Sequence, residues 1–187
     1  RIFYVILYRD YFFASPLEIL MVNRGGLAWQ GGFLGGILAG TVWCKRRGHA
    51  LRSMLDLAAP YIALGQAVGR LGCFFNGCCY GKPWVHGIFF PVHDARLHPT
   101  QLYEVAMGIV MFLILWRLRN HRHAEGWLFG IYCVLAGVER FAVEFYRAKD
   151  DRFFGPLTSA QLVAAGFIVA GIALLALRQS VGPGRPG

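Results

Sequence analysis

The stretch MLDLAAPYIALGQAVGRLGCFFNGCCYGKP, residues 54–83, decides the fold class of this chain. Its first part is an apolar run, 54–74, which is long enough for a helix to cross about 30 Å of hydrocarbon. After this run the sequence changes to glycines and cysteines, as expected where a helix leaves a bilayer. Arg70 lies near that end of the run. A charge inside a membrane span is costly, so its presence indicates a function.

The same apolar pattern recurs along the rest of the chain. The other segments of this kind are 27–44, 101–118, 126–146 and 158–177. Hydrophobic residues make up 56% of the 187 residues, and the mean hydropathy is +0.46, which is more apolar than usual for a soluble domain. We therefore expect an all-α, polytopic membrane helical bundle that forms a single integral membrane domain over residues 1–187.

The first residues bear on how many helices this bundle has. Residues 2–8 are apolar, and residue 1 is Arg rather than Met. We expect these residues to be the end of a further helix in an N-terminally incomplete chain. The prediction is thus about five full transmembrane helices plus the end of a sixth.

The net charge of +9 follows the loops. Lys and Arg gather in the segments 45–52, 117–122 and 178–185, which fall on one side of the membrane if the spans alternate. Cytoplasmic loops collect such residues, so the stretch after Arg70, together with the long loop 76–98, is predicted to face the outer side. This distribution argues against a nucleic-acid partner, since the basic residues do not form one soluble face.

A second charged span is GVERFAVEFYR, residues 137–147. Arg140, Glu144 and Arg147 are spaced i, i+4, i+7, so they share one face of a helix. One interpretation is a structural ion pair between Arg140 and Glu144. The other is an anion site, in which Arg70 and Arg140 converge on the phosphate of a lipid head group through paired hydrogen bonds.

The run HPTQLYE, residues 98–104, opens the next helix with polar side chains. Pro99 suits a first helical turn, and capping alone would explain Thr100 and Glu104. His98, Gln101 and Tyr103 add further polar groups at the same helix start. Beside the arginines, this set favours a polar pocket.

Three thiols lie in the opening stretch as Cys73, Cys78 and Cys79. The spacing C-x4-C-C fits a zinc site poorly, so we expect no metal ion and no cofactor. A disulfide from Cys73 to either neighbour is one alternative in an oxidising compartment. A thiol whose pKa is lowered by a nearby cation, acting as a nucleophile, is another.

Several of these runs occur together in one known family. RGGLAWQGG, DLAAPYIALGQAVGRLGCFFNGCCYGKP, HPTQLYE, RFAVEFYR and LTSAQL come in that family's order. On these runs the chain resembles the bacterial prolipoprotein diacylglyceryl transferases over residues 1–177. The resemblance implies a multi-pass enzyme of the bacterial inner (cytoplasmic) membrane with its active site toward the outer side. Such an enzyme moves the diacylglyceryl group of phosphatidylglycerol onto the cysteine thiol of a prolipoprotein lipobox segment, and it releases glycerol phosphate.

The resemblance also implies roles for individual residues. The residues implied to be catalytic are Arg70, Arg140, His98 and Glu144. The residues implied to bind substrate are Gln30, Asn76, Gly81, Gln101, Tyr103 and Glu104. The partners implied are phosphatidylglycerol, the lipobox segment and the lipid bilayer.

The chain departs from the family pattern at three of these motifs. Gln30 stands where the family has a His that is thought to deprotonate the incoming thiol, and Gln has no usable basicity. Cys73 and Cys78 stand where the family has Asn and Glu. His98 is then the candidate base. Two alternatives stay open, a related phospholipid-dependent transferase with another acceptor and a non-catalytic phospholipid-binding membrane protein.

Overall fold

The structure is a computed structural model, and it describes all residues except 27, 122–123, 149–151, 155–156 and 177–187. The side chains of Arg24, Trp29, Gln30 and Phe33 and of residues 152–154 also lie outside this description. The described chain divides into two compact units, Arg1–Leu51 and Arg52–Gly187. The basic segment 178–185 falls outside the described residues.

The first unit is helical throughout most of its length. Its elements are α1 (Ile2–Leu7), α2 (Arg9–Ala14), the 3-10 turns Pro16–Leu20 and Val22–Arg24, and α3 (Trp29–Arg47). The guanidinium of Arg1 fixes the segment between α2 and α3, because it donates hydrogen bonds to the carbonyls of Glu18 at 2.6 Å and Gly25 at 2.7 Å. Helix α3 ends at Gly48, whose φ of 71° is the left-handed geometry of a helix C-cap.

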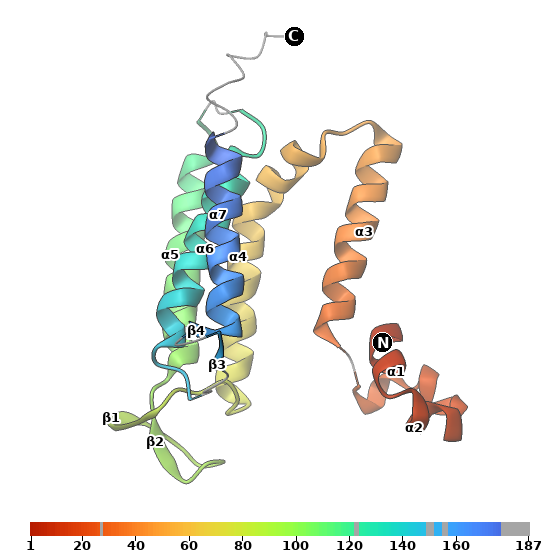
Figure 1. Cartoon of the computed structure of the whole chain (residues 1–187), viewed down its shortest axis with the longest axis vertical. Helices are drawn as coiled ribbons and strands as arrows, with labels where there is room; N and C mark the ends of the chain where they lie inside the picture. Colours follow the sequence, from red (N-terminus) through yellow and green to blue (C-terminus); the bar gives the residue numbers. More distant parts are fainter. Residues whose placement is uncertain (27, 122–123, 149–151, 155–156, 177–187) are drawn as a thin grey trace. The chain divides into compact units, whose positions relative to one another are not determined.

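The second unit contains four long helices that lie side by side (Figure 1). They are α4 (Leu51–Phe75), α5 (Thr100–Leu118), α6 (Trp127–Glu144) and α7 (Ser159–Ala176). All five apolar segments predicted from the sequence are therefore helices, α3 to α7, and the all-α class is confirmed. The core between α4, α5 and α6 includes Ala59, Ala63, Met111, Leu115 and Leu128.

Helices α6 and α7 pack through small residues. A Cβ atom added at Gly171 would lie 2.7 Å from the carbonyl oxygen of Gly130 and 2.8 Å from Val134 Cγ2. One added at Gly137 would lie 2.6 Å from Ile168 Cγ1. Glycine at these crossing points lets the two backbones approach closely, as is common between membrane helices.

The start of α6 is capped from a neighbouring helix. The buried carboxylate of Asp56, in α4, accepts the backbone N–H of Phe129 at 2.8 Å and that of Gly126. These N–H groups have no partner inside α6 because they belong to its first turn. Asp56 thus ties α4 to α6 at the end of the bundle opposite the cysteine stretch.

The long loop predicted at 76–98 contains a two-stranded hairpin. Strands β1 (Pro83–Phe90) and β2 (Ala95–Leu97) pair antiparallel, with Phe89 opposite Arg96. A second short pair joins β3 (Arg152–Phe154) and β4 (Leu157–Thr158) before α7. Both pairs lie at the end of the bundle where α4 finishes and α5 begins (Figure 1).

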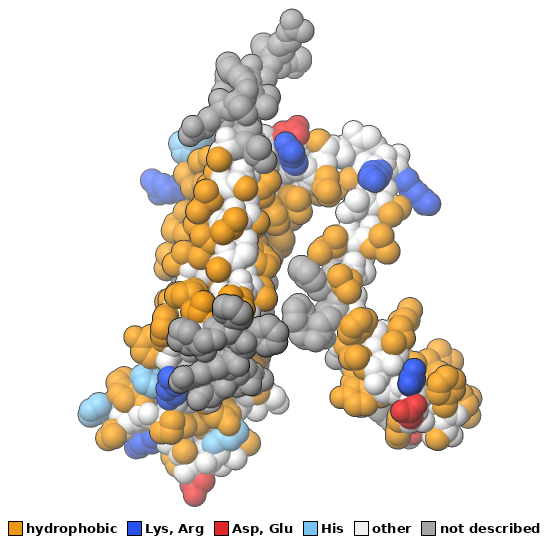
Figure 2. Space-filling view, viewed as in Figure 1, with side chains coloured by type: hydrophobic (Ala, Val, Ile, Leu, Met, Phe, Trp, Pro, Cys, Tyr) orange, Lys and Arg blue, Asp and Glu red, His pale blue; other side chains and the backbone are white. Residues whose placement is uncertain are grey.

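Two of the described helices, α5 and α7, are long and apolar enough to cross a membrane by their length and composition. Helix α4 carries Arg70, and α6 carries Arg140 and Glu144, so these two are more polar. Aliphatic side chains nevertheless point outward along the second unit, as Val68, Leu113 and Val169 are 56–66% exposed. Figure 2 shows hydrophobic side chains along the length of these helices. Such a continuous apolar surface is typical of contact with lipid or another protein.

Candidate active site

An ion pair joins α4 to α5 at the hairpin end of the bundle. Arg70 lies in the last two turns of α4, and its Nη2 is 3.1 Å from Oε1 of Glu104, near the start of α5. The Glu104 side chain is only 3% exposed, whereas that of Arg70 is 29% exposed. The Glu104 carboxylate is thus buried and holds the guanidinium of Arg70, which stays partly accessible to solvent or a ligand.

A second arginine approaches the same carboxylate. Nη1 of Arg147 is 3.9 Å from Glu104 Oε1, and its side chain is 10% exposed. Two guanidinium groups, one from α4 and one from the segment after α6, therefore approach the same buried carboxylate. The predicted convergence of Arg70 and Arg140 on one phosphate stays a prediction.

Arg140 has its own carboxylate partner one turn further along α6. It forms an ion pair with Oε2 of Glu144, and the hydroxyl of Thr158 donates to Oε1 of Glu144 at 3.1 Å. Thr158 Oγ1 also accepts the N–H of Gln161 at 3.2 Å, while Gln161 Oε1 accepts the N–H of Thr158 at 3.1 Å. This reciprocal capping box begins α7, so the start of α7 fixes Glu144 and, through it, Arg140.

The first turn of α5 holds the cysteine loop. Thr100 Oγ1 donates to the carbonyl of Cys79 at 2.8 Å, and Gln101 Nε2 donates to the carbonyl of Cys78 at 2.6 Å. Both donors are fully buried, at 0% exposure. The amide nitrogen of Gln101 thus supports this loop, whereas its Oε1 has no hydrogen-bond partner among the described residues.

Gly81 is placed where only glycine fits. A Cβ atom at this position would lie 2.7 Å from His98 Cβ and 2.8 Å from Thr100 Cγ2, and it would also meet the Tyr146 carbonyl. The Gly81 N–H donates to the carbonyl of His98 at 2.9 Å, and Gly81 pairs with Arg147 in an isolated bridge. Its role in this geometry is to let three segments of the site approach one another.

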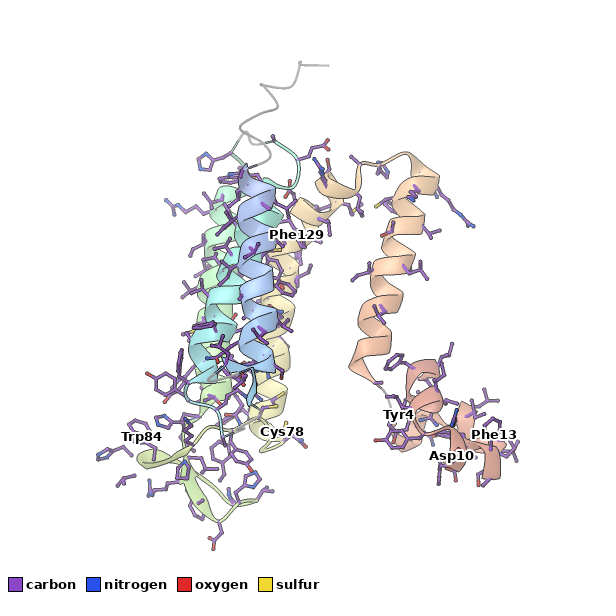
Figure 3. The ribbon with its side chains drawn as sticks, viewed as in Figure 1. Tyr4, Asp10, Phe13, Cys78, Trp84 and Phe129 are labelled. Atoms are coloured by element: carbon purple, nitrogen blue, oxygen red, sulfur yellow. The ribbon has the colours of Figure 1, made fainter. Side chains whose placement is uncertain are left out.

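His98 and Tyr103 form a separate aromatic group. Nδ1 of His98 is 3.2 Å from the hydroxyl of Tyr103, and its ring stacks on Trp84 at 4.5 Å with an interplanar angle of 2°. With Met107 and Tyr146 they line an open hollow of about 390 Å³. Trp84 lies on β1 at the same end of the molecule as Cys78 (Figure 3). The Tyr146 ring also lies beside those of His98 and Tyr103, with centroids 5.5 Å and 6.2 Å away.

Two more predicted residues have distinct positions. Asn76 is exposed, and its side chain hydrogen-bonds the Cys78 thiol, which lowers the pKa of that thiol below its ordinary value. Gln30 belongs to α3 in the first unit, and its side chain is outside the described residues. The structure therefore pairs Arg70 with Glu104 and Arg140 with Glu144 at one end of the second unit, and these two ion pairs form the centre of the candidate site. Asn76, Gly81, His98, Gln101 and Tyr103 lie at the same end of this unit.

Arg147, Thr158 and Gln161 belong to this centre but were not among the predicted site residues. A sequence signal exists for each of them. Arg147 continues the Arg140 and Glu144 spacing at i+7, and Thr158 with Gln161 has the T-x-x-Q spacing of a capping box. What the sequence does not show is that Arg147 reaches Glu104 on another helix.

Residues 1–177 match the family model described as prolipoprotein diacylglyceryl transferase. The chain belongs to this family. Three similar curated relatives are named phosphatidylglycerol–prolipoprotein diacylglyceryl transferase, and they come from Bacillus cereus (strain G9842), Bacillus mycoides (strain KBAB4) and Bacillus thuringiensis subsp. konkukian (strain 97-27). Each is 34% identical over 194 residues, which covers 97% of this chain and 72% of the relative.

Membership of the prolipoprotein diacylglyceryl transferase family confirms the resemblance stated from the sequence motifs. It is also consistent with a membrane enzyme, as α5 and α7 are long and apolar enough to cross a bilayer. In this family member, the buried carboxylates and partly exposed guanidiniums lie together at one end of the helices.

Proposed function

We propose that this chain transfers the diacylglyceryl group of phosphatidylglycerol to the cysteine thiol of a prolipoprotein. The observation that supports this most is the pairing of two partly exposed arginines with two buried glutamates. Arg70 and Arg140 are each 29% exposed, whereas Glu104 and Glu144 are 3–4% exposed. Such a carboxylate binds one side of the guanidinium and fixes its orientation. The remaining N–H groups can then donate hydrogen bonds to an incoming phosphate.

The reaction defines what these arginines do. The thiolate sulfur attacks a glycerol carbon of the lipid, a C–S bond forms, and the C–O bond to phosphate breaks. The electron pair leaves with glycerol phosphate, and the thiol proton is released. Negative charge thus grows on the phosphate oxygens, and fixed cations at that place stabilise the transition state. We assign this role to Arg70 and Arg140, with Glu144 holding Arg140.

The remaining site residues receive supporting roles. Oε2 of Glu104 and Oε1 of Gln101 are buried acceptors without a hydrogen-bond partner among the described residues. The glycerol head group of phosphatidylglycerol carries hydroxyl donors, which such acceptors suit. We assign Gly81 and Asn76 to shaping the loop beside the arginines. Tyr103 and His98 would contact substrate from the neighbouring hollow, with His98 as the candidate base.

The membrane arrangement belongs to the same proposal. We infer that α3, α4 and α6 cross the bilayer together with α5 and α7, with their charged residues turned toward the protein interior. The bilayer is the bacterial inner membrane, and the hairpin end with the site faces outward. The acceptor is then the lipobox segment of a prolipoprotein that emerges on that side.

The test is a transfer assay with the protein in detergent or bilayer. Phosphatidylglycerol labelled in its acyl chains and a lipobox peptide are supplied, and labelled peptide and released glycerol phosphate are measured. We expect thioether-linked product that falls at least about a hundredfold in Arg70→Ala and Arg140→Ala. Arg117→Ala removes an exposed arginine at the far end of α5 and should leave the rate unchanged. Binding of phosphatidylglycerol without any transfer would overturn the proposal in favour of another acceptor or a binding role.

A further inference from the structure

The three thiols of the loop after α4 form a compact cluster. Cys73 lies in the last turn of α4, and Cys78 and Cys79 follow the turn at Gly77. The Sγ atoms of all three lie within 4.8 Å of one another. All three are half-buried free cysteines, so the cluster is open to a ligand. The C-x4-C-C spacing predicted no metal site. A prediction from spacing alone omits the turn of the chain between Cys73 and Cys78.

The backbone around these thiols is built to hold them. Cys79 has φ of 63°, in the left-handed region that a non-glycine residue seldom adopts. The carbonyl groups of Cys78 and Cys79 are each fastened by a fully buried side chain, as described above for Gln101 and Thr100. An unusual conformation that its surroundings hold in place points to a function rather than to a loose loop.

The sulfur positions are close to those of a metal-bound thiolate set. Sulfur lies about 2.3 Å from zinc, so two sulfurs in a tetrahedral site are about 3.8 Å apart. Small rotations of the three side chains would bring Sγ atoms now within 4.8 Å to that separation. A disulfide would use only two of the three thiols, whereas a metal ion uses all of them.

We propose that Cys73, Cys78 and Cys79 bind one thiophilic divalent metal ion, such as zinc, which keeps a coordination position open for the acceptor cysteine thiol. Three protein ligands with an open fourth position is the arrangement of catalytic rather than structural zinc sites. Thiophilic ions of this kind prefer thiolate ligands. This inference rests on the proposed function for the identity of the acceptor.

The position of the cluster suits the reaction. Cys73 is three residues after Arg70 on α4, hence on the same helix face. An acceptor thiol bound to the metal loses its proton to solvent, since a coordinated thiol is deprotonated. Its sulfur then attacks the glycerol carbon as the phosphate leaves toward Arg70. Metal coordination in this way supplies a thiolate although Gln30 has no basicity.

The first experiment measures metal binding alone. The full protein in detergent is reduced, freed of metal with a chelator and titrated with Co²⁺, which gives strong thiolate charge-transfer absorption. We expect saturation at a single ion per chain, displacement by Zn²⁺, and loss of the band in Cys73→Ser, Cys78→Ser and Cys79→Ser. The buried Cys44 and Cys133 lie outside the cluster, so Cys44→Ser and Cys133→Ser should keep the band. No band in reduced wild-type protein would overturn the inference, whatever the variants do.

The redox state of the cluster gives an independent check. Cells are quenched with iodoacetamide, and the isolated protein is analysed by peptide mass. We expect Cys73, Cys78 and Cys79 to be alkylated without prior reduction. A disulfide from Cys73 to either neighbour in the quenched cells would overturn the metal site.

The second experiment asks whether the acceptor thiol reaches the metal. A lipobox peptide and its Cys→Ser counterpart are added to the Co²⁺-loaded protein without phospholipid. We expect the cysteine peptide alone to shift the spectrum, and an unchanged spectrum would overturn the open position. In the transfer assay, metal-free protein with an undiminished rate would overturn the inference while the proposed function stands. A shifted spectrum without transfer would instead count against the proposed function.

Discussion

Each arginine at the site is paired with a glutamate that is more buried than the arginine itself. Glu104 and Glu144 come from the ends of two helices, and neither can reach bulk water to any extent. A buried carboxylate is stable only when it is paired and hydrogen-bonded, so the ion pairs with Arg70, Arg140 and Arg147 stabilise the folded protein. The two interpretations of Arg140 with Glu144, structural pair and anion site, are therefore compatible.

At the residue scale, we predict that Glu104→Gln lowers the transfer rate by about tenfold to a hundredfold. The neutral amide no longer fixes the guanidinium of Arg70, so the phosphate is misplaced relative to the attacking thiol. The rate is measured with labelled phosphatidylglycerol and a lipobox peptide. As a matched control, Asp10→Asn neutralises an exposed carboxylate of the first unit and should have no effect. A Glu104→Gln protein with the full rate would show that Glu104 does not orient Arg70.

At the scale of elements, the helix ends do most of the positioning. The start of α5 holds the cysteine loop, and the start of α7 holds Glu144 through Thr158. The start of α6 is held at the opposite end by Asp56 of α4. Polar backbone groups at helix starts need partners, and in this protein those partners also link one helix to the next.

We predict that Asp56→Ala lowers the free energy of unfolding by about 1–2 kcal/mol, as expected for loss of a helix cap. The substitution leaves the N–H groups of Gly126 and Phe129 without this acceptor. Thermal unfolding in detergent, followed by circular dichroism, measures the change. Glu125→Ala removes an exposed carboxylate from the same turn and should shift the transition very little. Equal effects of the two substitutions would contradict the capping role.

The contact between α6 and α7 allows a second test at this scale. Gly171→Val introduces atoms where the Gly130 carbonyl and Val134 already lie, and overpacking of this kind costs about 1–3 kcal/mol. The expected result is a lower unfolding temperature in detergent. Gly166 lies on the same helix with nothing within 4 Å of an added Cβ, so Gly166→Val is the matched control. If both variants unfold at the wild-type temperature, the close approach of α6 and α7 is not needed for stability.

For the whole molecule, the second unit has all its catalytic candidates at one end. The end of α4, the hairpin, the start of α5 and the end of α6 meet there (Figure 1). A transferase whose acceptor is exported needs this end on the outer side, and the basic segments at 45–52 and 117–122 are predicted to lie opposite.

We predict that the two ends differ in access from outside the cell. In a background with Cys73, Cys78 and Cys79 changed to Ser, Val92→Cys in the hairpin turn should react with a membrane-impermeant maleimide in intact cells. His121→Cys, after α5, should react only once the cells are permeabilised. Both native side chains are exposed, so burial does not explain a difference. Labelling of His121→Cys in intact cells would reverse the proposed orientation.

Sequence reasoning was most successful where the signal is local. Apolar runs predicted α3 to α7, and the helical spacing of Arg140 and Glu144 predicted their ion pair. The hairpin at 83–97 was anticipated only as a loop, because β2 has only three residues and the pairing is irregular, with a register shift between Pro83 and Ile88. Whether all five helices cross the bilayer stays a prediction, with α5 and α7 meeting the length and composition test.

The sequence by itself determined the helical class, the family and the residue types of the site, because these depend on hydropathy, helical periodicity and motifs read along the chain. Only the tertiary structure decided which groups meet. It brought Arg147 to Glu104, turned Gln101 toward the cysteine loop and placed the His98 ring beside Trp84 and Tyr103. It also brought the Sγ atoms of Cys73, Cys78 and Cys79 within 4.8 Å of one another, which their C-x4-C-C spacing did not predict. Contacts between segments depend on how helices pack and loops turn. Local patterns along the sequence do not predict that geometry.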